Sequence, residues 1–321
     1  MSASISVVIP VHNAAASLGR CLGALKTSTF QNFECVVVDD GSTDDSAALA
    51  AASGARVIAT GGQRGPAYAR NRGVEAAKGE ILFFIDADVM VQSGTLAQVA
   101  NAFEENAALD ALIGSYDEEP AEPNFLSQYK NLMHCFVHQH GRRRASTFWT
   151  GCGAIRKCAF EEFGGFDESY VRPSIEDIEL GARLVRAGKS IELEPTLMVK
   201  HLKRWTLPGL LTSDIRDRAI PWTVLMLRER NIPNDLNVQS SQRISVVLVY
   251  LALLLAPFYW PVPAISLIVT IVLNHRFYGF LARKRGLWFA IRAVPLHLAY
   301  FLYSGASFVV GCVKALRAGL Q

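Results

Sequence analysis

Two aspartates, Asp86 and Asp88, follow a short apolar run and carry the clearest chemistry in this 321-residue chain. The run at residues 81–85 predicts a buried strand, because short apolar runs bounded by polar residues are typical of one. Side chains alternate along a strand, so both carboxylates are expected on the same side of its tip. Neighbouring carboxylates repel each other unless a cation lies beside them. Oxygen ligands suit Mg²⁺ or Mn²⁺, which also hold substrate phosphates. The pair therefore indicates a metal site for a diphosphate-linked substrate, with a solvated acidic loop as the alternative.

The first 200 residues alternate between strand-like and helix-like patterns. Strands are predicted at residues 5–11, 33–40, 56–59, 81–85, 111–116 and 148–156, and helices at residues 14–28, 42–52, 65–77, 95–106, 125–140 and 178–187. Residues 190–202 are expected to be extended, and Ser42 and Ser174 are predicted helix caps. This order implies an α/β fold with a mostly parallel sheet flanked by helices. Ligands of such sheets bind beyond the carboxyl ends of the strands, where Asn13, Asp39, Asp40, Asp86 and Asp88 all fall.

Charge divides the chain into two chemically different parts. Residues 242–321 contain eight Lys or Arg and no Asp or Glu, whereas the preceding residues carry a net charge of −5. No sustained basic stripe marks the first part, so a nucleic-acid partner is excluded. A basic, apolar tail indicates a membrane with anionic headgroups. The six cysteines have no metal-site spacing, which favours a reducing compartment. No cleaved signal peptide is evident, so the soluble part is expected in the cytoplasm at the inner (plasma) membrane.

Three apolar segments follow an amphipathic stretch near the C-terminus. Residues 206–230 could lie flat on a membrane or pack on the preceding domain. Residues 244–260 approach the length of a membrane span, residues 262–273 are shorter, and residues 288–313 are longer but interrupted by polar residues. Two crossings, or a re-entrant hairpin turning at residues 257–263, would return the cationic residues 283–285 to the cytoplasmic side. We expect a catalytic domain at 1–205, an interfacial linker at 206–241 and membrane helices at 242–321.

The motifs of the first part resemble glycosyltransferase family 2. They occur in the order of that family: VVIPVHN at 7–13, VVDDGSTD at 37–44, ARNRG at 69–73, DAD at 86–88, FGGFDE at 163–168, EDIEL at 176–180 and HLKRW at 201–205. Each motif alone is weak, but the ordered set is specific. The resemblance implies a GT-A fold, which is a nucleotide-sugar-binding α/β domain, and it does not cover the apolar tail.

The resemblance also implies a role for each matching residue. Pro10, Val11 and Asn13 would surround the nucleotide, with Asp39 on the base and Asp40 beside it. Arg70 would contact phosphate or base, and Asp86 the ribose or donor sugar. Arg204 and Trp205 would complete the donor site. Asp88 would bind the divalent metal, and His201 would support it. The alternatives are an acidic turn for Asp39 and Asp40, a surface salt bridge for Arg70, and a structural role for His201.

Asp177 is the candidate catalytic base. A sugar hydroxyl is a poor nucleophile, so a positioned carboxylate must remove its proton. In the family, this aspartate gives direct displacement with inversion. The alternative for Glu176 and Asp177 is stabilisation of a helix N-terminus.

The expected activity is transfer of one sugar rather than polymerisation, because processive members carry Gln where His201 stands. A UDP-sugar donor and a hydroxyl on a lipid or lipid-linked acceptor fit the motifs and the tail. The alternatives are a polyprenyl-phosphate sugar transferase, whose acceptor needs no base, a sugar nucleotidyltransferase, and a non-catalytic nucleotide-sugar-binding membrane protein.

Overall fold

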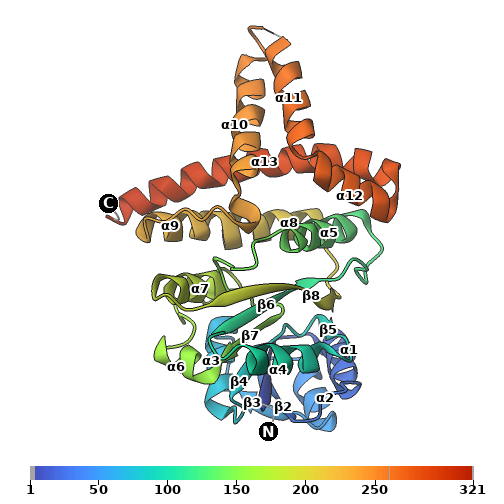
Figure 1. The fold of residues 1–321 in the computed structure, drawn as a ribbon, viewed down its shortest axis with the longest axis vertical. Coiled ribbons are helices and arrows are strands. Elements are labelled where there is room, and N and C mark those ends of the chain that lie inside the picture. Colours follow the sequence, from blue (N-terminus) through green and yellow to red (C-terminus); the bar gives the residue numbers. More distant parts are fainter. Residues whose placement is uncertain (1–3, 260, 320–321) are drawn as a thin grey trace. The chain divides into compact units, whose positions relative to one another are not determined.

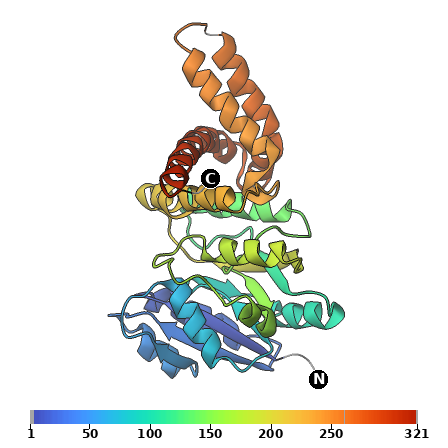
Figure 2. The same ribbon diagram turned by 90° about the vertical axis from the view of Figure 1, so that its left-hand side faces the viewer.

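The computed structural model describes residues 4–259 and 261–319. The chain divides into two compact units, Met1–Arg204 and Trp205–Gln321. Figures 1 and 2 trace both units by colour along the sequence. The first unit contains the sheet and the second is helical.

A mixed sheet forms the centre of the first unit, with the strand order β3-β2-β1-β4-β7-β6-β8-β5. The strands are β1 Ile5–Val11, β2 Phe33–Asp39, β3 Arg56–Ala59, β4 Ile81–Phe84, β5 Val89–Val91, β6 Ala111–Tyr116, β7 Gly153–Arg156 and β8 Ile191–His201. The pairs β1–β2, β2–β3, β1–β4 and β6–β8 are parallel, and β7 and β5 pair with their neighbours in the antiparallel sense. The predicted α/β class is therefore confirmed, with β7 inserted as an antiparallel strand into a mostly parallel sheet and β5 added in the antiparallel sense at one edge.

Helices connect these strands in the first unit. They are α1 Ala15–Lys26, α2 Ser46–Ala52, α3 Pro66–Ala76, α4 Thr95–Glu105, α5 Phe125–Gln139, α6 Lys157–Glu162 and α7 Glu176–Arg186. Because α1, α2 and α3 are the crossovers between parallel strands, the carboxyl ends of β1, β2 and β4 meet at one edge of the sheet. The predicted polar residues follow those ends.

An aromatic cluster lies against β4. The ring centroid of Phe84 is 6.2 Å from that of Phe148, 5.6 Å from that of Phe160 and 5.2 Å from that of Phe166. These side chains are buried, and each one stabilises the fold by about 1.5–3 kcal/mol. Phe166 belongs to the segment that follows α6, so the cluster holds that segment against the strand that leads to Asp86 and Asp88.

Several local predictions are wrong. Strand β4 ends at Phe84, so Asp86 and Asp88 lie in a turn before β5 rather than on a strand tip, and the alternation rule does not apply to them. Helix α2 begins at Ser46, not after Ser42, because Asp44 accepts hydrogen bonds from the backbone and side chain of Ser46. The N-cap of α7 is Ile175 rather than Ser174.

The strand predicted at residues 148–156 is also shorter than expected. Only β7, Gly153–Arg156, pairs within the sheet, and the residues before it form turns. Gly181 of α7 lies so close to this stretch that a Cβ there would be 2.1 Å from the backbone nitrogen of Phe148. The stretch therefore packs on α7, which carries Asp177, instead of continuing the strand.

The second unit consists of helices. They are α8 Leu207–Leu211, the π-helix η1 Thr212–Ala219, α9 Ile220–Arg228, the 3-10 helix η2 Leu236–Val238, α10 Ser240–Leu255, α11 Pro261–Leu273, α12 His275–Arg285 and α13 Leu287–Arg317. Helices α10 and α11 lie side by side and project steeply from α13 in both views (Figures 1 and 2). Among the described residues, α13 is the one helix that is by itself long and apolar enough to cross a membrane. Trp260, the predicted end of one apolar segment, lies outside the described residues.

Candidate active site

Arg70 connects three elements at the carboxyl edge of the sheet. Its Nη2 atom is 2.7 Å from Oδ1 of Asp86, after β4, and its Nη1 atom is 2.8 Å from Oε1 of Glu176, at the start of α7. The residue is buried, so the alternative of a surface salt bridge is wrong. Burial lowers the pKa of the Arg70 guanidinium, but the carboxylates of Asp86, Glu176 and Asp177 raise it above its ordinary value. Arg70 therefore stays charged and joins the DAD turn to α7.

The two carboxylates of the DAD turn have different environments. Burial raises the pKa of Asp86, Arg70 opposes this rise, and Asp88 adds to it. About two fifths of the Asp86 side chain (39%) is still exposed, so it can contact a ligand. For Asp88, burial would raise the pKa, but contact with His201 and the charge of Lys203 lower it below its ordinary value. Asp88 is therefore the more readily ionised of the two.

His201 is held in one orientation beside Asp88. It ends β8, and its Nδ1 atom is 2.7 Å from Oδ1 of Asn131, on α5. An amide oxygen can only accept, so Nδ1 carries the hydrogen and Nε2 presents its lone pair when the ring is neutral. The ring also stacks on Tyr116, with centroids 4.4 Å apart and planes at 9°. These contacts direct Nε2 toward Oδ2 of Asp88, 3.6 Å away.

A divalent cation fits between these two atoms. A separation of 3.6 Å is longer than a hydrogen bond, and two metal–ligand bonds of about 2.1 Å can span it. Among the described residues, no group of three or more His, Cys, Asp and Glu side chains is placed to hold a metal. Further ligands would come from a bound diphosphate and water, which is usual for Mg²⁺. The predicted pair Asp88 and His201 thus suits a metal that is bound together with its substrate.

Asp177 lies next to Glu176 in the first turn of α7 and is buried. Its Oδ2 atom accepts hydrogen bonds from the backbone nitrogen and hydroxyl of Thr150, at 3.1 and 3.2 Å, and its Oδ1 atom accepts from the backbone nitrogen of Ile178, at 2.8 Å. The Thr150 segment and the first turn of α7 therefore fix the position of the candidate base.

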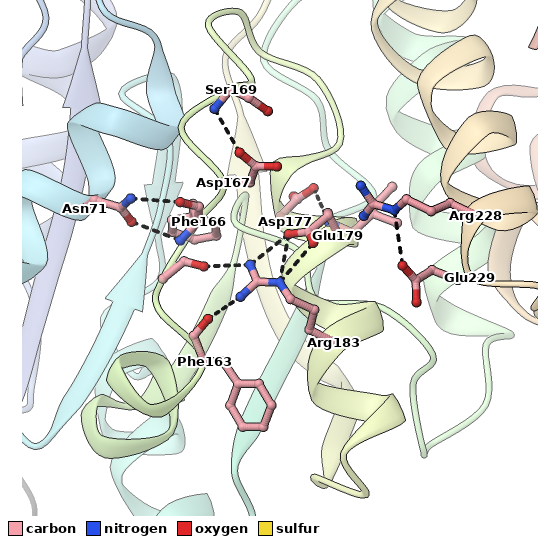
Figure 3. Close-up of polar contacts among 12 residues, drawn as sticks. Asn71, Phe163, Phe166, Asp167, Ser169, Asp177, Glu179, Arg183, Arg228 and Glu229 are labelled. Carbon is pink, nitrogen blue, oxygen red and sulfur yellow. Dashed lines mark hydrogen bonds and ion pairs between the residues drawn. The ribbon is translucent and has the colours of Figure 1, made fainter. Parts of the chain in front are cut away.

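Hydrogen bonds hold the segment 163–168 to α7 and to α3 (Figure 3). Arg183 of α7 donates hydrogen bonds to the carbonyl oxygens of Phe163 and Gly165 while its guanidinium pairs with Glu179. On α3, the side-chain amide of Asn71 donates to the carbonyl oxygen of Phe166 and accepts from its backbone nitrogen, at 2.9 and 3.0 Å. Since Arg70 is the neighbour of Asn71, these bonds fix α3 and α7 at the distance that the Arg70 ion pairs require.

The residues predicted to hold the nucleotide form a second group, after β1 and β2. Asn13 has a positive φ of 50°, and its Oδ1 atom accepts a hydrogen bond from the backbone nitrogen of Thr43 at 2.7 Å. Asp39 accepts from the backbone nitrogen of Ser42 at 3.0 Å. The backbone nitrogen of Asp40 donates to the carbonyl oxygen of Val11 at 2.8 Å. These bonds bring the VVIPVHN and DDGS motifs together at the edge of the sheet.

Asp40 organises the loop that precedes α3. Its carboxylate accepts from the hydroxyl of Thr60 and from the backbone nitrogens of Arg64 and Gly65, at 2.9, 2.9 and 2.8 Å. Gly65 has a φ of 97°, and a Cβ there would be 2.5 Å from the carbonyl oxygen of Val171, so only glycine fits. These contacts give Asp40 a structural function that the motif alone does not indicate.

Pro10 and Val11 belong to this group through their strand pairing, whereas Arg204 and Trp205 are placed differently. Pro10 and Val11 lie within β1, opposite Val38 and Asp39 of β2. The guanidinium of Arg204 is largely exposed and lies 3.4 Å from Oε2 of Glu122. Trp205 is buried and is the first residue of the second unit. The donor-binding roles of Arg204 and Trp205 have no geometric support within the first unit.

Sequence reasoning missed three residues that position this site. They are Asn131, which orients His201, Thr150, which holds Asp177, and Arg183, which holds the 163–168 segment. Asn131 and Arg183 lie on amphipathic helices, where their polarity alone gives no sign of a function. Thr150 lies within residues 148–156, whose pattern predicts a strand and gives no sign of a contact with Asp177.

Two family descriptions match the first unit. Residues 6–164 match "Glycosyl transferase family 2", and residues 131–204 match "N-terminal domain of galactosyltransferase". All the residues of the candidate site except Trp205 lie within these two matches.

Curated proteins of similar sequence are also described as glycosyltransferases. The pre-mycofactocin glycosyltransferase of Mycobacterium tuberculosis is 31% identical over 219 residues, which are 63% of this chain and 43% of that protein. The chain spans about half the length of three curated relatives that it matches, from 43% to 52%.

Two solved structures share the fold. The mannosyltransferase PcManGT of Pyrobaculum calidifontis, in complex with GDP-Man and Mn²⁺, has a TM-score of 0.55 at 16% identity, covering 98% of this chain and 88% of its own. S. aureus TarS 1–349, in complex with UDP-GlcNAc, has a TM-score of 0.54 at 18% identity, covering 98% of this chain and 92% of its own. The predicted GT-A fold is thus confirmed.

Proposed function

Since the chain belongs to glycosyltransferase family 2, we propose that it transfers a single sugar from a nucleoside-diphosphate sugar to a hydroxyl group of a lipid or lipid-linked acceptor. The observation that carries this proposal is the two ion pairs that the buried Arg70 forms with Asp86 and Glu176. Arg70 joins Asp86, beside the candidate metal residues, to Glu176, the neighbour of the candidate base. One buried cation thereby links the proposed donor and acceptor sides of a single site.

Asp88 and Nε2 of His201 would hold a divalent Mg²⁺ or Mn²⁺ together with the donor diphosphate. When bound, the metal supplies positive charge to the departing nucleoside diphosphate. Asn13 and Asp39 would bind the nucleotide, and we favour uracil as the base. The structural neighbours were solved with GDP-Man and with UDP-GlcNAc, so the fold accepts either nucleotide and the choice of uridine rests on the family motifs.

Asp177 would accept the proton of the acceptor hydroxyl. The hydroxyl oxygen forms a bond to the anomeric carbon as the bond from that carbon to the diphosphate oxygen breaks on the opposite face. The proton stays on the carboxylate of Asp177, the electron pair leaves with the nucleoside diphosphate, and the configuration is inverted. The bonds from Thr150 keep the carboxylate in place for this step.

We propose that the enzyme works at the inner (plasma) membrane, with the first unit in the cytoplasm. The length and apolar character of α13, and the absence of acidic residues in the sequence after residue 241, support membrane attachment. A lipid or lipid-linked acceptor follows from that attachment. The His201 position, where processive family members carry Gln, supports a single transfer.

The substitution Asp177→Asn tests the base. Removing a general base lowers the rate by about 10²–10⁴-fold, so we expect kcat for sugar transfer to fall by that factor. Donor binding should persist, because the amide keeps an oxygen that can accept the bonds from Thr150. Transfer would be measured with a radiolabelled UDP-sugar, and donor affinity by calorimetry with Mn²⁺ present.

The matched control is Glu161→Gln, an exposed residue of α6 whose carboxylate lies 3.8 Å from Nζ of Lys157. Its activity should equal that of the wild type. Full activity of Asp177→Asn on a phosphate acceptor would identify a polyprenyl-phosphate sugar transferase instead. Donor binding without product on any acceptor, in the wild type, would favour a non-catalytic binding protein.

A further inference from the structure

We propose that the second unit is held by one leaflet of an anionic bilayer, with the α10–α11 hairpin inserted and α13 lying in the plane of the interface. The proposal takes from the proposed function only its membrane attachment, and sugar transfer plays no part in it. The apolar surface of the second unit, its buried polar contacts and the distribution of its charge support this arrangement.

The α10–α11 hairpin has its apolar side chains outside. The exposed residues include Phe258 at the turn, with 82% of its surface accessible, and Leu254, with 65%. The others are Ile244, Val247, Leu251, Leu253, Tyr259, Ile265, Ile268, Val269, Ile271, Val272 and Leu273. A surface of this kind is unstable in water and suits a hydrocarbon solvent.

Polar groups of the hairpin face inward and bond to one another. The amide nitrogen of Asn274 donates to the hydroxyl of Ser245 at 2.9 Å, and Thr270 donates to the carbonyl oxygen of Ser266 at 2.8 Å. At the base of the hairpin, Gln242 donates to Oδ1 of Asn274 at 3.2 Å. Polar inside and apolar outside is the pattern of helices that pack in lipid.

The hairpin is too short to cross a bilayer. Helix α10 has 16 residues and α11 has 13, which correspond to about 24 and 20 Å at 1.5 Å per residue. The hydrocarbon core is about 30 Å thick. The described turn, residues 256–259, carries no charged side chain that would favour emergence on the far side. Both ends of the hairpin therefore stay on the side from which it enters.

Helix α13 has two different faces. Ile291, Val309 and Leu316 are 50%, 61% and 67% exposed, and their spacings of 18 and 7 residues put them on one side of the helix. Helix α10 meets that same side, where Tyr250 donates to the carbonyl oxygen of Leu302 at 2.8 Å. The opposite side is buried, and a Cβ at Gly311 would be 2.5 Å from Cβ of Thr223 on α9. The exposed apolar side of α13 is thus the side on which α10 packs, and Figure 1 shows α10 and α11 projecting from α13.

A polar contact near the middle of α13 argues against a crossing by this helix. Residues 293–313 contain no charged side chain, and Tyr303 is their midpoint. The hydroxyl of Tyr303 donates to the carboxylate of Asp214 on η1 at 2.7 Å. A perpendicular α13 would carry Asp214, and with it the neighbouring charges of η1, to the middle of the bilayer, where charged groups are strongly disfavoured. A helix lying flat, with η1 on its aqueous side, avoids this cost.

Cations flank the apolar surfaces and indicate a leaflet with anionic headgroups. Arg283, Lys284 and Arg285 form the last turn of α12, and Lys314 and Arg317 lie in the last turn of α13. Arg292 is exposed near the start of α13. Since residues 242–321 contain no acidic side chain, this surface complements anionic phospholipid headgroups.

Depth measurements on the full chain test the arrangement. Cys35, Cys158 and Cys312 would be replaced by alanine, and single cysteines placed at the exposed positions Phe258, Ile291, Ala306 and Leu316 would carry an environment-sensitive fluorophore. The labelled protein would be bound to phosphatidylcholine–phosphatidylglycerol vesicles with bromine atoms at defined acyl depths. We expect the label at 258 to be quenched most by the deepest bromines. The three labels on α13 should be quenched equally, by the shallowest ones.

Two results would overturn the proposal. A label at 306 that lies deeper than those at 291 and 316 would mean that α13 crosses the bilayer. Shallow quenching at 258 would mean that the hairpin tip is not held in the hydrocarbon. Neither measurement depends on sugar transfer, so failure of the proposed enzymatic activity would leave both informative.

A charge at the hairpin tip provides a second test. We expect Phe258→Lys to weaken binding to phosphatidylglycerol-containing vesicles by about 10-fold or more in flotation, because a buried lysine is costly in hydrocarbon. The matched control is Val171→Lys, at a 65% exposed position of the first unit, which should bind like the wild type. Unchanged binding of Phe258→Lys, or equal wild-type binding to vesicles of phosphatidylcholine alone, would contradict the proposal. Thermal unfolding in detergent would verify that both variants are folded.

Discussion

The imidazole of His201 is oriented by a side chain that lies 70 residues earlier in the sequence. Asn131 is on α5 and is 1% exposed, and its amide oxygen fixes the hydrogen of the ring on Nδ1. A hydrogen bond of this kind to a metal-binding histidine usually controls both its tautomer and its basicity. Asn131 therefore acts through His201 and is a positioning residue, not a metal ligand.

We expect Asn131→Ala to weaken Mn²⁺ binding in the presence of UDP by about 10–100-fold, the usual effect of losing such a partner. The measurement is the Mn²⁺ concentration that gives half of the maximal thermal stabilisation. Asn131→Asp should retain much of the affinity, because it keeps an oxygen that accepts from Nδ1. If Asn131→Ala and Asn131→Asp have the same Mn²⁺ affinity as the wild type, the residue has only a packing role.

The sequence could predict which side chains lie together at the edge of the sheet, but not which partners hold them in position. Arg70, Asp86 and Glu176 come from three of the motifs and meet in two ion pairs, whereas the resemblance assigns Arg70 to phosphate or base. Asp40, by contrast, holds the loop before α3. The motif pattern cannot separate these two uses of a carboxylate, because both place an acid at a strand end. Partners such as Thr150 and Asn131 depend on tertiary packing, which no local spacing encodes.

At the element scale, α7 is the helix on which the candidate site depends most. Its first turn carries Glu176 and Asp177, and one turn later Glu179 pairs with Arg183. The Glu179 side chain is 6% exposed, and the Arg183 fork also binds two carbonyl oxygens of the 163–168 segment. Helix α7 is therefore fixed to the 163–168 segment. That segment is in turn fixed to α3 through the bonds between Phe166 and Asn71.

We expect Arg183→Met to lower the free energy of unfolding of the first unit by about 2–3 kcal/mol, since charge-assisted bonds are lost and a buried carboxylate is left without its cation. Urea denaturation followed by tryptophan fluorescence would measure the change. Arg20→Met, at an exposed position of α1, is the control and should change stability by less than about 0.5 kcal/mol. Equal effects of the two substitutions would show that the Arg183 bonds do not support the fold.

The order of the elements could be read from the sequence because apolar periodicity is strong in β1, β2, β4 and the helices between them. The three-residue strand β5 was missed, because Val89–Val91 is too short to show a period. The antiparallel direction of β7 also has no local signal, since it depends on where α5 and the turn-rich stretch after it return the chain to the sheet. Errors at helix starts arose where Asp44 and Glu176, rather than the predicted serines, bond to backbone nitrogens.

At the scale of the whole molecule, charge and apolar surface separate the two units. Acidic groups concentrate in the first unit, where Arg70 and the proposed metal compensate those of the site. The second unit exposes apolar helices flanked by cations. Composition predicted this division, but the distinction between crossing and lying in the interface depends on contacts such as that of Tyr303 with Asp214.

Removal of the metal should affect the two units differently. We expect UDP with Mn²⁺, at about 100 times its dissociation constant, to stabilise the first unit by about 2.7 kcal/mol. For a unit of this size, that raises its transition temperature by about 5–10 °C. A chelator should abolish the shift, because in the proposed site Asp88 and His201 would provide two protein ligands and the diphosphate would bind with the metal. The transition of the second unit, followed in detergent, should not move and serves as the internal control.

Stabilisation by UDP that survives the chelator would exclude the metal from donor binding. A thermal shift with GDP and none with UDP would replace uridine by guanosine as the donor nucleotide.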